Sequence, residues 1–585
     1  MRRKQAGRFA SYSLQAFRKD MLAGVVVGVI AIPLGMGFAI ASGVKPEYGI
    51  YTTIIAGILI SLLGGSKFQI GGPTGAFIPI LLGIVMTYGY DNLLIAGILA
   101  GIMLYMMGLF KLGSLIQYIP HSVTIGFTAG IAVQIFTGQL GNLFGLTGLV
   151  KHEHFLSNMK ELVIHAGTWN GYSVLTAIIC FFVILLVQRY LPKIPGALVG
   201  LIGSSIAAAL LFPGQVATIG STFGEIPNTL PSFRLPDLSW ETWVRMLQPA
   251  LVIAMLGGIE SLLSAVVADG MTADRHDSNK ELRAQGIANM ITPLFGGIPA
   301  TGAIARTATN IKNGAVSPIS GIIHGIVVLL VLLLCAPYAS AIPLAAMAPV
   351  LMLVAWNMSE RKAFAHLLVT RTGDSLVLVI TFLLTVLADL TVAVEVGLLM
   401  AIILFVKRAG DTFQVSQVLP DLEDEQHKLG THMVDQDHDC PQIMIYKVNG
   451  PLFFGVARMF TTGLDEAIER KPKAVIIRMA SAPYMDMTGA KMLKEGLRTL
   501  QKQGTKVLIS GIQPQPLAIL KRSGLYTIIG AGAFFEQTNK AIEVATQLVN
   551  EQACKACSQH AFQECESLSL GIAVGVPSKQ ASSGS

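Results

Sequence analysis

The sequence predicts an all-α polytopic membrane domain of fourteen segments followed by a smaller α/β domain. Of the 585 residues, 52% are hydrophobic and 13% are charged, whereas roughly a quarter of the residues are charged in soluble proteins. Long apolar runs recur as far as Lys407, and short β-type runs alternating with helical ones follow residue 440. We therefore expect a membrane domain at 1–410, a linker at 411–440, an α/β domain at 441–550 and a flexible, Cys-containing tail at 551–585.

The apolar runs define the fourteen membrane segments. Their approximate bounds are 20–43, 48–65, 74–88, 91–110, 121–140, 172–190, 194–212, 247–268, 284–296, 301–314, 317–336, 341–356, 374–388 and 391–407. The runs at 74–88 and 301–314 are too short for a hydrocarbon core of about 30 Å, which requires roughly 20 helical residues. We interpret both as half-helices. Each is the third element of a group of seven, and an odd number of elements inverts one group relative to the other. The pattern thus predicts two inverted repeats of seven.

The positive charges indicate how the chain is oriented. The net charge is +7, and Arg2, Arg3, Lys4 and Arg8 precede the first apolar run. By the positive-inside rule this cluster keeps the N-terminus in the cytoplasm, and an even number of segments places the C-terminus there too. We therefore expect a multi-pass protein of the inner or plasma membrane in contact with lipid, and no nucleic-acid partner.

Both half-helices begin near the same three residues, Thr74-Gly75-Ala76 and Thr301-Gly302-Ala303. A Gly/Pro break at membrane depth is tolerated only where the chain lines a cavity or is buried in protein. Each half-helix would aim free N–H groups and the positive end of its dipole at one shared site, which suits an anion. The alternative is that small residues merely let two helices pack closely. Two matching breaks favour substrate binding. Extended segments at Phe68–Ile70 and Leu294–Phe295 could cross there.

Two charged residues lie close to these breaks. Glu260 stands in an apolar span, where a carboxylate costs about 2.5–3.5 kcal/mol on insertion scales, and Ser264 follows one turn later on the same helical face. We predict a coupling-ion site at Glu260 and Ser264; the alternative is a neutral, structural Glu. Arg306, on the second half-helix, would add a positive charge to the anion site; the alternative is a structural partner of Glu260. Gln69 is a weaker candidate.

One residue and four short segments of the membrane part resemble the corresponding parts of the sulfate permease (SulP) family. They are Pro33, 71–76, 258–264, 279–286 and 296–306. The turn at 484–489 resembles the signature of a STAS domain, a fold shared with anti-sigma-factor antagonists. The resemblance implies secondary transport of a small anion by elevator-like movement of a core against a gate domain, in a dimer without enzymatic activity. Sulfate is the first choice of substrate, followed by bicarbonate or a dicarboxylate.

The resemblance also bears on the coupling ion. Sodium-coupled relatives carry Asp with Thr one turn on, and a hydroxyl on the second half-helix; Glu260, Ser264 and Ile304 stand at these positions here. Ile304 removes one oxygen ligand, and hard cations require several, so proton coupling is preferred. Sodium-coupled bicarbonate symport and anion exchange stay open. A nucleobase symporter is disfavoured by Arg306 and the STAS domain, and a membrane-anchored STAS signalling protein by the paired breaks.

The remaining motifs predict less. Cys554, Cys557, His560 and Cys565 are candidate zinc ligands by residue type, but their spacing is irregular and free thiols are the alternative. No Walker A motif or strand-linked GxGxxG occurs, so no nucleotide cofactor is expected. In the STAS-like turn Met487 replaces a hydroxyl of the antagonists, which favours a docking or dimer contact over a phosphoswitch. A cytosolic protein partner of this domain stays open.

Overall fold

The computed structural model describes residues 12–114, 120–152, 154–191, 194–236, 239–388, 390–419, 439–559, 561–562 and 564–565. The chain forms two compact units, residues 1–401 and 402–585. The basic residues Arg2, Arg3, Lys4 and Arg8, on which the orientation argument rests, lie outside the described residues.

The first unit is helical, and its first half has these elements: α1 (Leu14–Ala41), α2 (Pro46–Leu63), β1 (Gly71–Gly72), the 3-10 helix η1 (Gly75–Phe77), α3 (Ile78–Tyr88), α4 (Tyr90–Leu109), α5 (His121–Gly138), α6 (Leu140–Phe144), α7 (Phe155–Ile164), α8 (Gly171–Tyr190), α9 (Gly196–Leu211), α10 (Ile219–Phe223) and α11 (Trp240–Arg245). The second half has α12 (Leu247–Thr272), α13 (Ser278–Ile291), η5 (Thr292–Phe295), β2 (Thr301–Gly302), α14 (Ile304–Lys312), α15 (Ile319–Ser340), α16 (Leu344–Met358), α17 (Arg361–Val369), α18 (Gly373–Leu387) and α19 (Leu390–Asp411). All fourteen predicted segments coincide with helices. The short connecting helices α7, α10, α11 and α17 were not predicted, because none forms a long apolar run.

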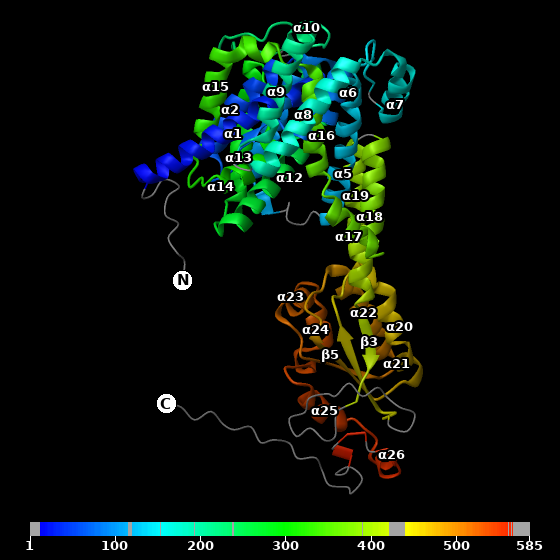
Figure 1. Cartoon of the computed structure of the whole chain (residues 1–585). Helices are drawn as coiled ribbons and strands as arrows, with labels where there is room; N and C mark the ends of the chain where they lie inside the picture. Colours follow the sequence, from blue (N-terminus) through cyan, green and yellow to red (C-terminus); the bar gives the residue numbers. More distant parts are fainter. Residues whose placement is uncertain are drawn as a thin grey trace. The chain divides into compact units, whose positions relative to one another are not determined.

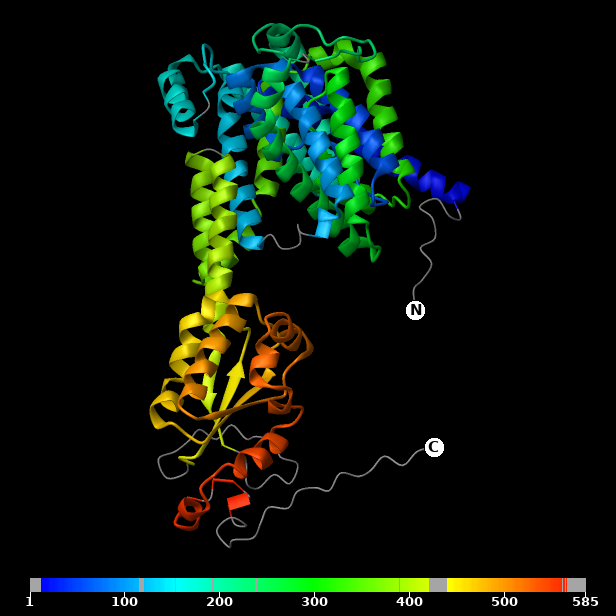
Figure 2. The same ribbon diagram turned by 180° about the vertical axis from the view of Figure 1, so that it is seen from behind.

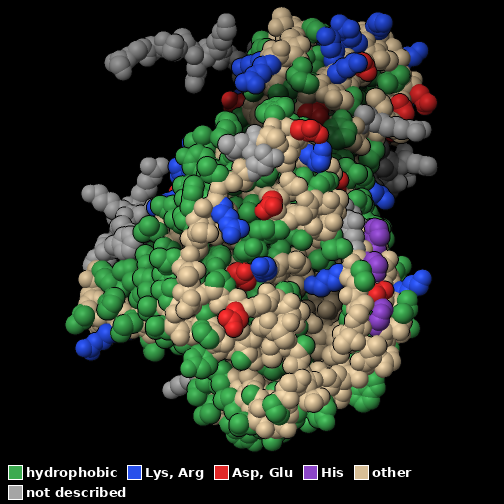
Figure 3. All heavy atoms as spheres, turned by 90° about the horizontal axis from the view of Figure 1, so that it is seen from above, with side chains coloured by type: hydrophobic (Ala, Val, Ile, Leu, Met, Phe, Trp, Pro, Cys, Tyr) green, Lys and Arg blue, Asp and Glu red, His purple; other side chains and the backbone are tan. Residues whose placement is uncertain are grey.

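Much of the surface of this unit suits lipid. Among the described residues, seven helices are long and apolar enough to cross a membrane (α1, α2, α4, α5 with α6, α8, α12 and α15), and three shorter apolar segments correspond to η1 with α3, α9 and α18. Large apolar side chains of α8 and α9 are exposed, among them Phe182 and Leu210. Figure 3, a view from above, shows hydrophobic side chains gathered at the edge of the unit, and Lys, Arg, Asp and Glu side chains scattered over the end that faces the viewer. The unit is a polytopic membrane domain.

The two halves interlock as inverted repeats. Helix α1 packs against α15, α2 against α13, and α4 against both α12 and α13, so helices of the first half (blue) lie beside those of the second (green) in Figures 1 and 2. These helices, with α3 and α14, form a first helix group. A second group consists of α5, α8, α9, α16 and α18, which pack on one another. The groups touch where η1 and α3 meet α5 and where α1 meets α16.

Strands β1 and β2 cross antiparallel between the repeats, with Gly71 opposite Gly302 and Gly72 opposite Thr301. A two-fold axis through this pairing equates Gly71 with Thr301, and therefore Thr74 with Ile304. The two Thr-Gly-Ala copies are thus offset by three residues and are not structurally equivalent. The repeats do cross antiparallel, but not through the predicted segments: the strands are residues 71–72 and 301–302, Phe68–Ile70 only precede β1, and Leu294–Phe295 end η5. The first turn of η5 contains Pro293, a residue with φ preset for such a turn.

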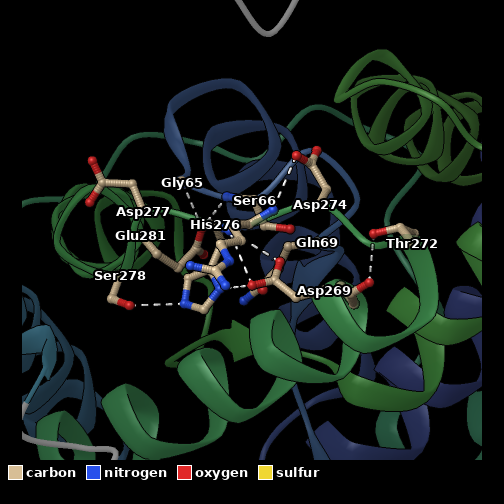
Figure 4. Close-up of polar contacts among 12 residues, drawn as sticks. Gly65, Ser66, Gln69, Asp269, Thr272, Asp274, His276, Asp277, Ser278 and Glu281 are labelled. Carbon is tan, nitrogen blue, oxygen red and sulfur yellow. Dashed lines mark hydrogen bonds and ion pairs between the residues drawn. The ribbon is translucent and has the colours of Figure 1, made fainter. Parts of the chain in front are cut away.

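Glu281, near the start of α13, ties the repeats together at one end of the first helix group (Figure 4). Its fully buried carboxylate accepts hydrogen bonds from the amides of Gly65 at 2.7 Å and Ser66 at 3.2 Å, in the turn between α2 and β1. A Cβ at Gly65 would lie 2.0 Å from the Asp277 carbonyl oxygen, so only glycine permits this approach. A buried carboxylate requires such partners, and here they fix the chain leading into β1 against α13.

His276 fastens the end of α12 beside this contact, also in Figure 4. Its Nδ1 lies 2.8 Å from Asp269 Oδ2 and its Nε2 lies 2.9 Å from Ser278 Oγ, while Lys67 Nζ lies 2.9 Å from Asp274 Oδ2. The turn between α12 and α13 is therefore bound both to itself and to the segment before β1.

The C-terminal unit contains a five-stranded sheet of order β3 (Gln414–Gln417), β4 (Ile443–Asn449), β5 (Ala474–Ser481), β6 (Lys506–Ser510) and β7 (Phe534–Phe535), in which β3 is antiparallel and the other strands are parallel. Its helices are α20 (Ala457–Gly463), α21 (Asp465–Arg470), α22 (Met487–Lys502), α23 (Pro514–Arg522), α24 (Leu525–Ile529), α25 (Thr538–Thr546) and α26 (Glu551–Lys555). Helix α20 packs on α22, and α25 packs against β5 and β6. The predicted α/β alternation is confirmed.

Two assignments around this domain need correction. Residues 414–417 of the predicted linker form β3, because pairing with β4 supplies partners that a short polar segment cannot find within itself. Part of the predicted tail also belongs to the domain: α26 begins at Glu551, and Ala561 and Phe562 are each 2% exposed within its core. Residues 566–585 lie outside the described residues.

We expect Glu281→Leu to destabilise the membrane unit strongly. The substitution removes the carboxylate that accepts from the amides at 65 and 66, and a buried donor that loses its acceptor costs about 1–3 kcal/mol. Glu281→Gln keeps one acceptor oxygen and should cost less. The measurement is the apparent melting temperature of the purified full-length protein in detergent, with Glu225→Leu at an exposed position as the control. Equal melting temperatures for Glu281→Leu and wild type would contradict this role.

Candidate functional site

The candidate site lies where η1 and α14 begin, beside α12. Glu260 of α12 is partly buried, and its Oε2 accepts a hydrogen bond of 2.9 Å from Thr74 Oγ1. Thr74 is the N-cap residue of η1. The structure thus brings together the intramembrane carboxylate and the first of the two predicted breaks.

Arg306 lies in the first turn of α14 and is 4% exposed. Its Nη2 donates a hydrogen bond to the Pro73 carbonyl, and Nη1 has no hydrogen-bond partner among the described residues. The guanidinium attracts Glu260 electrostatically, but the two side chains form no direct ion pair. One donor of a buried cation is therefore left for a ligand.

Gly72 explains how Arg306 reaches this position. A Cβ at Gly72 would lie 2.6 Å from Arg306 Nη1, and its φ of +150° is one that other residues rarely adopt. The strand register also equates Arg306 with Ala76 of the first repeat. The two half-helices thus present unlike residues, one of them cationic, to the same site.

The second Thr-Gly-Ala segment is largely occupied by protein contacts. Thr301 Oγ1 lies 2.9 Å from the Gly257 carbonyl and 2.7 Å from Ser261 Oγ. The amide of Gly302 donates to Ser261 Oγ, and that of Ala303 donates to the Ile70 carbonyl. The available donors on this side are instead the amides of the first turn of α14, starting at Ile304, because a helix leaves its first N–H groups without intrahelical partners.

Ser264 is not directed towards Glu260. Its Oγ donates to Thr307 Oγ1 at 3.2 Å, and the Ile70 amide donates to the same Thr307 oxygen at 3.1 Å. Sequence reasoning paired Ser264 with Glu260 because both fit one helical face. It missed Ser261, which binds Thr301 and Gly302; the signal was the spacing of Gly257, Ser261 and Ser264 along one side of α12.

Two further side chains hold the second crossing segment in place, and sequence reasoning missed both. Thr52 Oγ1 donates to the Ile298 carbonyl at 3.0 Å and accepts a hydrogen bond from the backbone amide of Ile298 at 2.7 Å. Asn289 bonds both the amide and the carbonyl of Ala300, each at 2.8 Å. Gln69, a weaker candidate, donates to the Ser261 carbonyl at 3.1 Å. All three serve the backbone, so polar residue type alone could not identify their role.

Apolar side chains from both helix groups surround Gly75. A Cβ there would lie 3.0 Å from Met358 Sδ, 3.1 Å from Ile135 Cδ1 and 3.7 Å from Phe38 Cε1. Nearby, an apolar cavity of about 30 Å³ separates α5 from α12 and is lined in part by Ile259, next to Glu260. Gly75, at the start of η1, therefore lies at the boundary between the two helix groups.

The cysteine-rich segment shows no metal site among the described residues: no group of three or more His, Cys, Asp or Glu side chains there is arranged to hold an ion. His560 lies outside the described residues. Cys554, Cys557 and Cys565 are free thiols, and burial raises the pKa of Cys565 to about 11. That thiol is therefore protonated at neutral pH.

The turn before α22 is built around Asp486. Its Oδ1 accepts from the Gly489 amide at 2.6 Å, and its Oδ2 accepts from the Phe454 amide at 3.1 Å. Asp486 is thus the N-cap of the helix, and the neighbouring Met487 is 57% exposed. An exposed apolar residue here suits the docking or dimer contact expected from the sequence.

Relatives resemble the chain over most of its length. The Bacillus subtilis (strain 168) protein YvdB, whose name assigns it provisionally to sulfate transport, is 54% identical over 91% of this chain and 98% of its own. The bicarbonate transporter BicA of Picosynechococcus sp. is 29% identical over 87% of this chain and 91% of its own.

Solved structures show the same fold. The overall structure of SLC26A9 superposes with a TM-score of 0.82, at 18% identity, over 95% of this chain and 93% of its own. The transmembrane domain of a cyanobacterial BicA gives a TM-score of 0.58, at 29% identity, over 67% of this chain and 98% of its own. Residues 17–381 match the sulfate permease family and residues 434–541 match the STAS domain. The chain therefore belongs to the sulfate permease family, with a STAS domain after its membrane unit.

Proposed function

We propose that this protein is a secondary active transporter of a small anion, coupled to protons. The observation that carries the proposal is the convergence of two half-helix starts on one place that also holds the unpartnered Arg306 Nη1 and the carboxylate of Glu260. Free amides at helix starts favour anions, and a buried guanidinium strengthens that preference.

Sulfate is the first choice of substrate, followed by bicarbonate or a dicarboxylate. The name of YvdB, which is 54% identical to this chain, points to sulfate, and that of BicA points to bicarbonate. All of these anions present oxygens that the amides at Gly75 and Ile304 and the unpartnered Nη1 of Arg306 could bind. The choice among them therefore rests on the relatives rather than on a distinctive contact.

Several contacts support protons over sodium. Ile304 offers no side-chain oxygen, Ser264 is engaged with Thr307, and the Thr301 hydroxyl is engaged with α12. The nearby Arg306 cation would also repel a sodium ion bound at Glu260. A proton, by contrast, needs no oxygen ligands beyond the carboxylate itself. A bound anion would offset the positive charge of Arg306, which otherwise stabilises the ionised carboxylate of Glu260. Anion binding would therefore favour the protonated form of Glu260.

Transport would proceed by movement of the first helix group against the second. The proposed site belongs to the first group except for its apolar lining, where Ile135 and Met358 face Gly75. Such a contact lacks polar bonds that would resist sliding, which supports an elevator-like mechanism. A homodimer and a protein partner of the STAS domain are further proposals from the family.

We expect Glu260→Gln to abolish uptake driven by a proton gradient while leaving anion exchange active. Gln keeps the shape and the hydrogen bond to Thr74 but cannot titrate. The measurement is uptake of labelled sulfate, bicarbonate and fumarate into proteoliposomes with pH or sodium gradients, compared with Glu225→Gln at an exposed position.

Uptake by Glu260→Gln at the wild-type rate under a proton gradient would overturn the coupling role. Stimulation of wild type by sodium, and not by protons, would favour the alternative of sodium-coupled bicarbonate symport. Equal rates under every gradient would favour exchange.

We expect Arg306→Ala to weaken anion affinity by about 10- to 100-fold, since a hydrogen bond to a charged group contributes about 1.5–3 kcal/mol. Arg306→Lys should give an intermediate affinity because the charge remains and the fork is lost. Equilibrium binding of the labelled anion to purified protein measures this, with the exposed Arg189→Ala as the matched control. An unchanged affinity in Arg306→Ala would remove Arg306 from the site.

A further inference from the structure

Helix α1 begins outside the packed part of the membrane unit. It runs from Leu14 to Ala41, and at 1.5 Å per residue its 28 residues measure about 42 Å, more than a hydrocarbon core of about 30 Å requires. Figures 1 and 2 show its first turns, in dark blue, extending sideways from the other helices. Ser13 caps this end, because its Oγ accepts a hydrogen bond of 3.1 Å from the Ala16 amide. The extension is therefore a regular, capped piece of helix.

Asp20 fixes the depth of this extension. Its carboxylate is fully buried and accepts hydrogen bonds from the Val316 amide at 2.7 Å and from the Ser317 amide at 3.1 Å. These amides lie just before α15, which starts at Ile319 and is long and apolar enough to cross the membrane. Because a crossing helix starts near a face of the bilayer, the turns of α1 before Asp20 lie at or beyond that face.

One side of these turns is apolar and exposed. Leu14 is 71% exposed, Phe17 39%, Met21 44% and Val25 40%. Their spacing of three or four residues places them along one side of the helix, and we call them the apolar stripe. In water such a stripe is unfavourable. At the level of the lipid headgroups it can instead enter the boundary with the acyl chains.

The neighbouring side of the same turns is basic. Arg18 and Lys19 are both exposed, and Asp20 is the single acid among the first 46 residues of the sequence. That carboxylate is occupied further by Ser317 Oγ, 2.5 Å from its Oδ2, and by Tyr12 Oη at 2.9 Å. The two cations therefore lie beside the apolar stripe with no exposed acid of α1 near them.

Helix α1 is fixed to the first helix group directly after Asp20. A Cβ at Gly24 would lie 2.5 Å from the Ser320 carbonyl oxygen, and one at Gly28 would lie 2.9 Å from Val327 Cβ. Small residues at successive turns let α1 and α15 approach closely. A ligand that binds the first turns of α1 therefore acts on the whole first helix group.

We propose that the first two turns of α1 bind an anionic phospholipid. Leu14, Phe17 and Met21 contact the acyl chains, whereas Arg18 and Lys19 bind the phosphate. An apolar stripe beside basic residues is the pattern of helices that lie in the membrane interface. By the positive-inside rule the basic end of α1 faces the cytoplasm, and anionic lipids of the cytoplasmic leaflet attract basic residues near its surface. The bound lipid holds the first helix group at the bilayer surface, whichever anion is transported.

The experiment titrates two lipids with identical acyl chains, phosphatidylglycerol and phosphatidylcholine, into the purified full-length protein in a neutral detergent. The readout is the apparent melting temperature. We expect phosphatidylglycerol to raise it more than phosphatidylcholine does. Salt at about 1 M should remove the difference, because it shortens the range of electrostatic attraction to about 3 Å. This measurement tests the charges in the wild-type protein itself.

Two double variants separate the charges from the apolar stripe. Arg18→Gln with Lys19→Gln should require about 30-fold more phosphatidylglycerol for the same rise, or about fivefold for each basic residue near a membrane surface. Its response to phosphatidylcholine should not change. Leu14→Ser with Phe17→Ser should reduce the response to both lipids, since the acyl chains lose their contacts.

The matched control is Arg189→Gln with Arg275→Gln, at two exposed cations near other helix ends, which should respond like the wild type. Equal rises with both lipids in the wild type would overturn the proposal, and so would an equal loss of response in the control. A full response to the soluble headgroup glycerophosphoglycerol would indicate a free anion rather than a lipid. If Leu14→Ser with Phe17→Ser changes the mass of the solubilised particle and keeps its lipid response, the stripe contacts a second copy of the chain instead.

Discussion

The membrane unit depends on one constraint: at its centre, every backbone amide and carbonyl must find a partner without help from water. The crossing of β1 and β2 meets this need for only two residues in each strand. Side chains complete it, with Thr52 and Asn289 serving Ile298 and Ala300, and Thr307 serving Ile70. Because these partners come from α2, α13 and α14, the crossing can form only when the two repeats are interlocked.

The same constraint determines which groups remain for function. Hydroxyls that serve the crossing, such as those of Thr301 and Ser264, are already engaged. Thr74, Glu260 and Arg306 lie just beyond the strands, where helix starts rather than strand pairs supply the backbone geometry. The asymmetry between Ala76 and Arg306 then gives a nearly symmetric scaffold a single cationic side. A symmetric crossing thus supports an asymmetric site.

The sequence predicted the helices well, because hydropathy reports the free energy of inserting a segment and needs no knowledge of its neighbours. It also singled out Glu260 and Arg306 as candidates, because charges at membrane depth are conspicuous, and the structure places both beside the first break. It could not predict the three-residue offset of the Thr-Gly-Ala copies, since register follows from long-range pairing. Nor could it find Ser261 or Asn289, whose roles arise from backbone groups distant in sequence. Strand β3 was missed for the same reason, as its partner lies beyond the linker.

The charges of Arg306 and Glu260 determine how much net charge would cross the membrane with each anion, and so how strongly the membrane potential would affect transport. With Arg306 charged and Glu260 ionised, the empty site has no net charge. Under the proposed proton coupling, a monovalent anion bound together with one proton on Glu260 keeps the site neutral, so a helix group that moves with it would carry no additional charge. Sulfate with one proton leaves one negative charge, and each such charge costs or gains about 2.3 kcal/mol per 100 mV. If the proposed coupling holds, the response of uptake to voltage follows from the valence of the anion, because Arg306 and Glu260 are the cation and the titratable acid that the described residues place at this site.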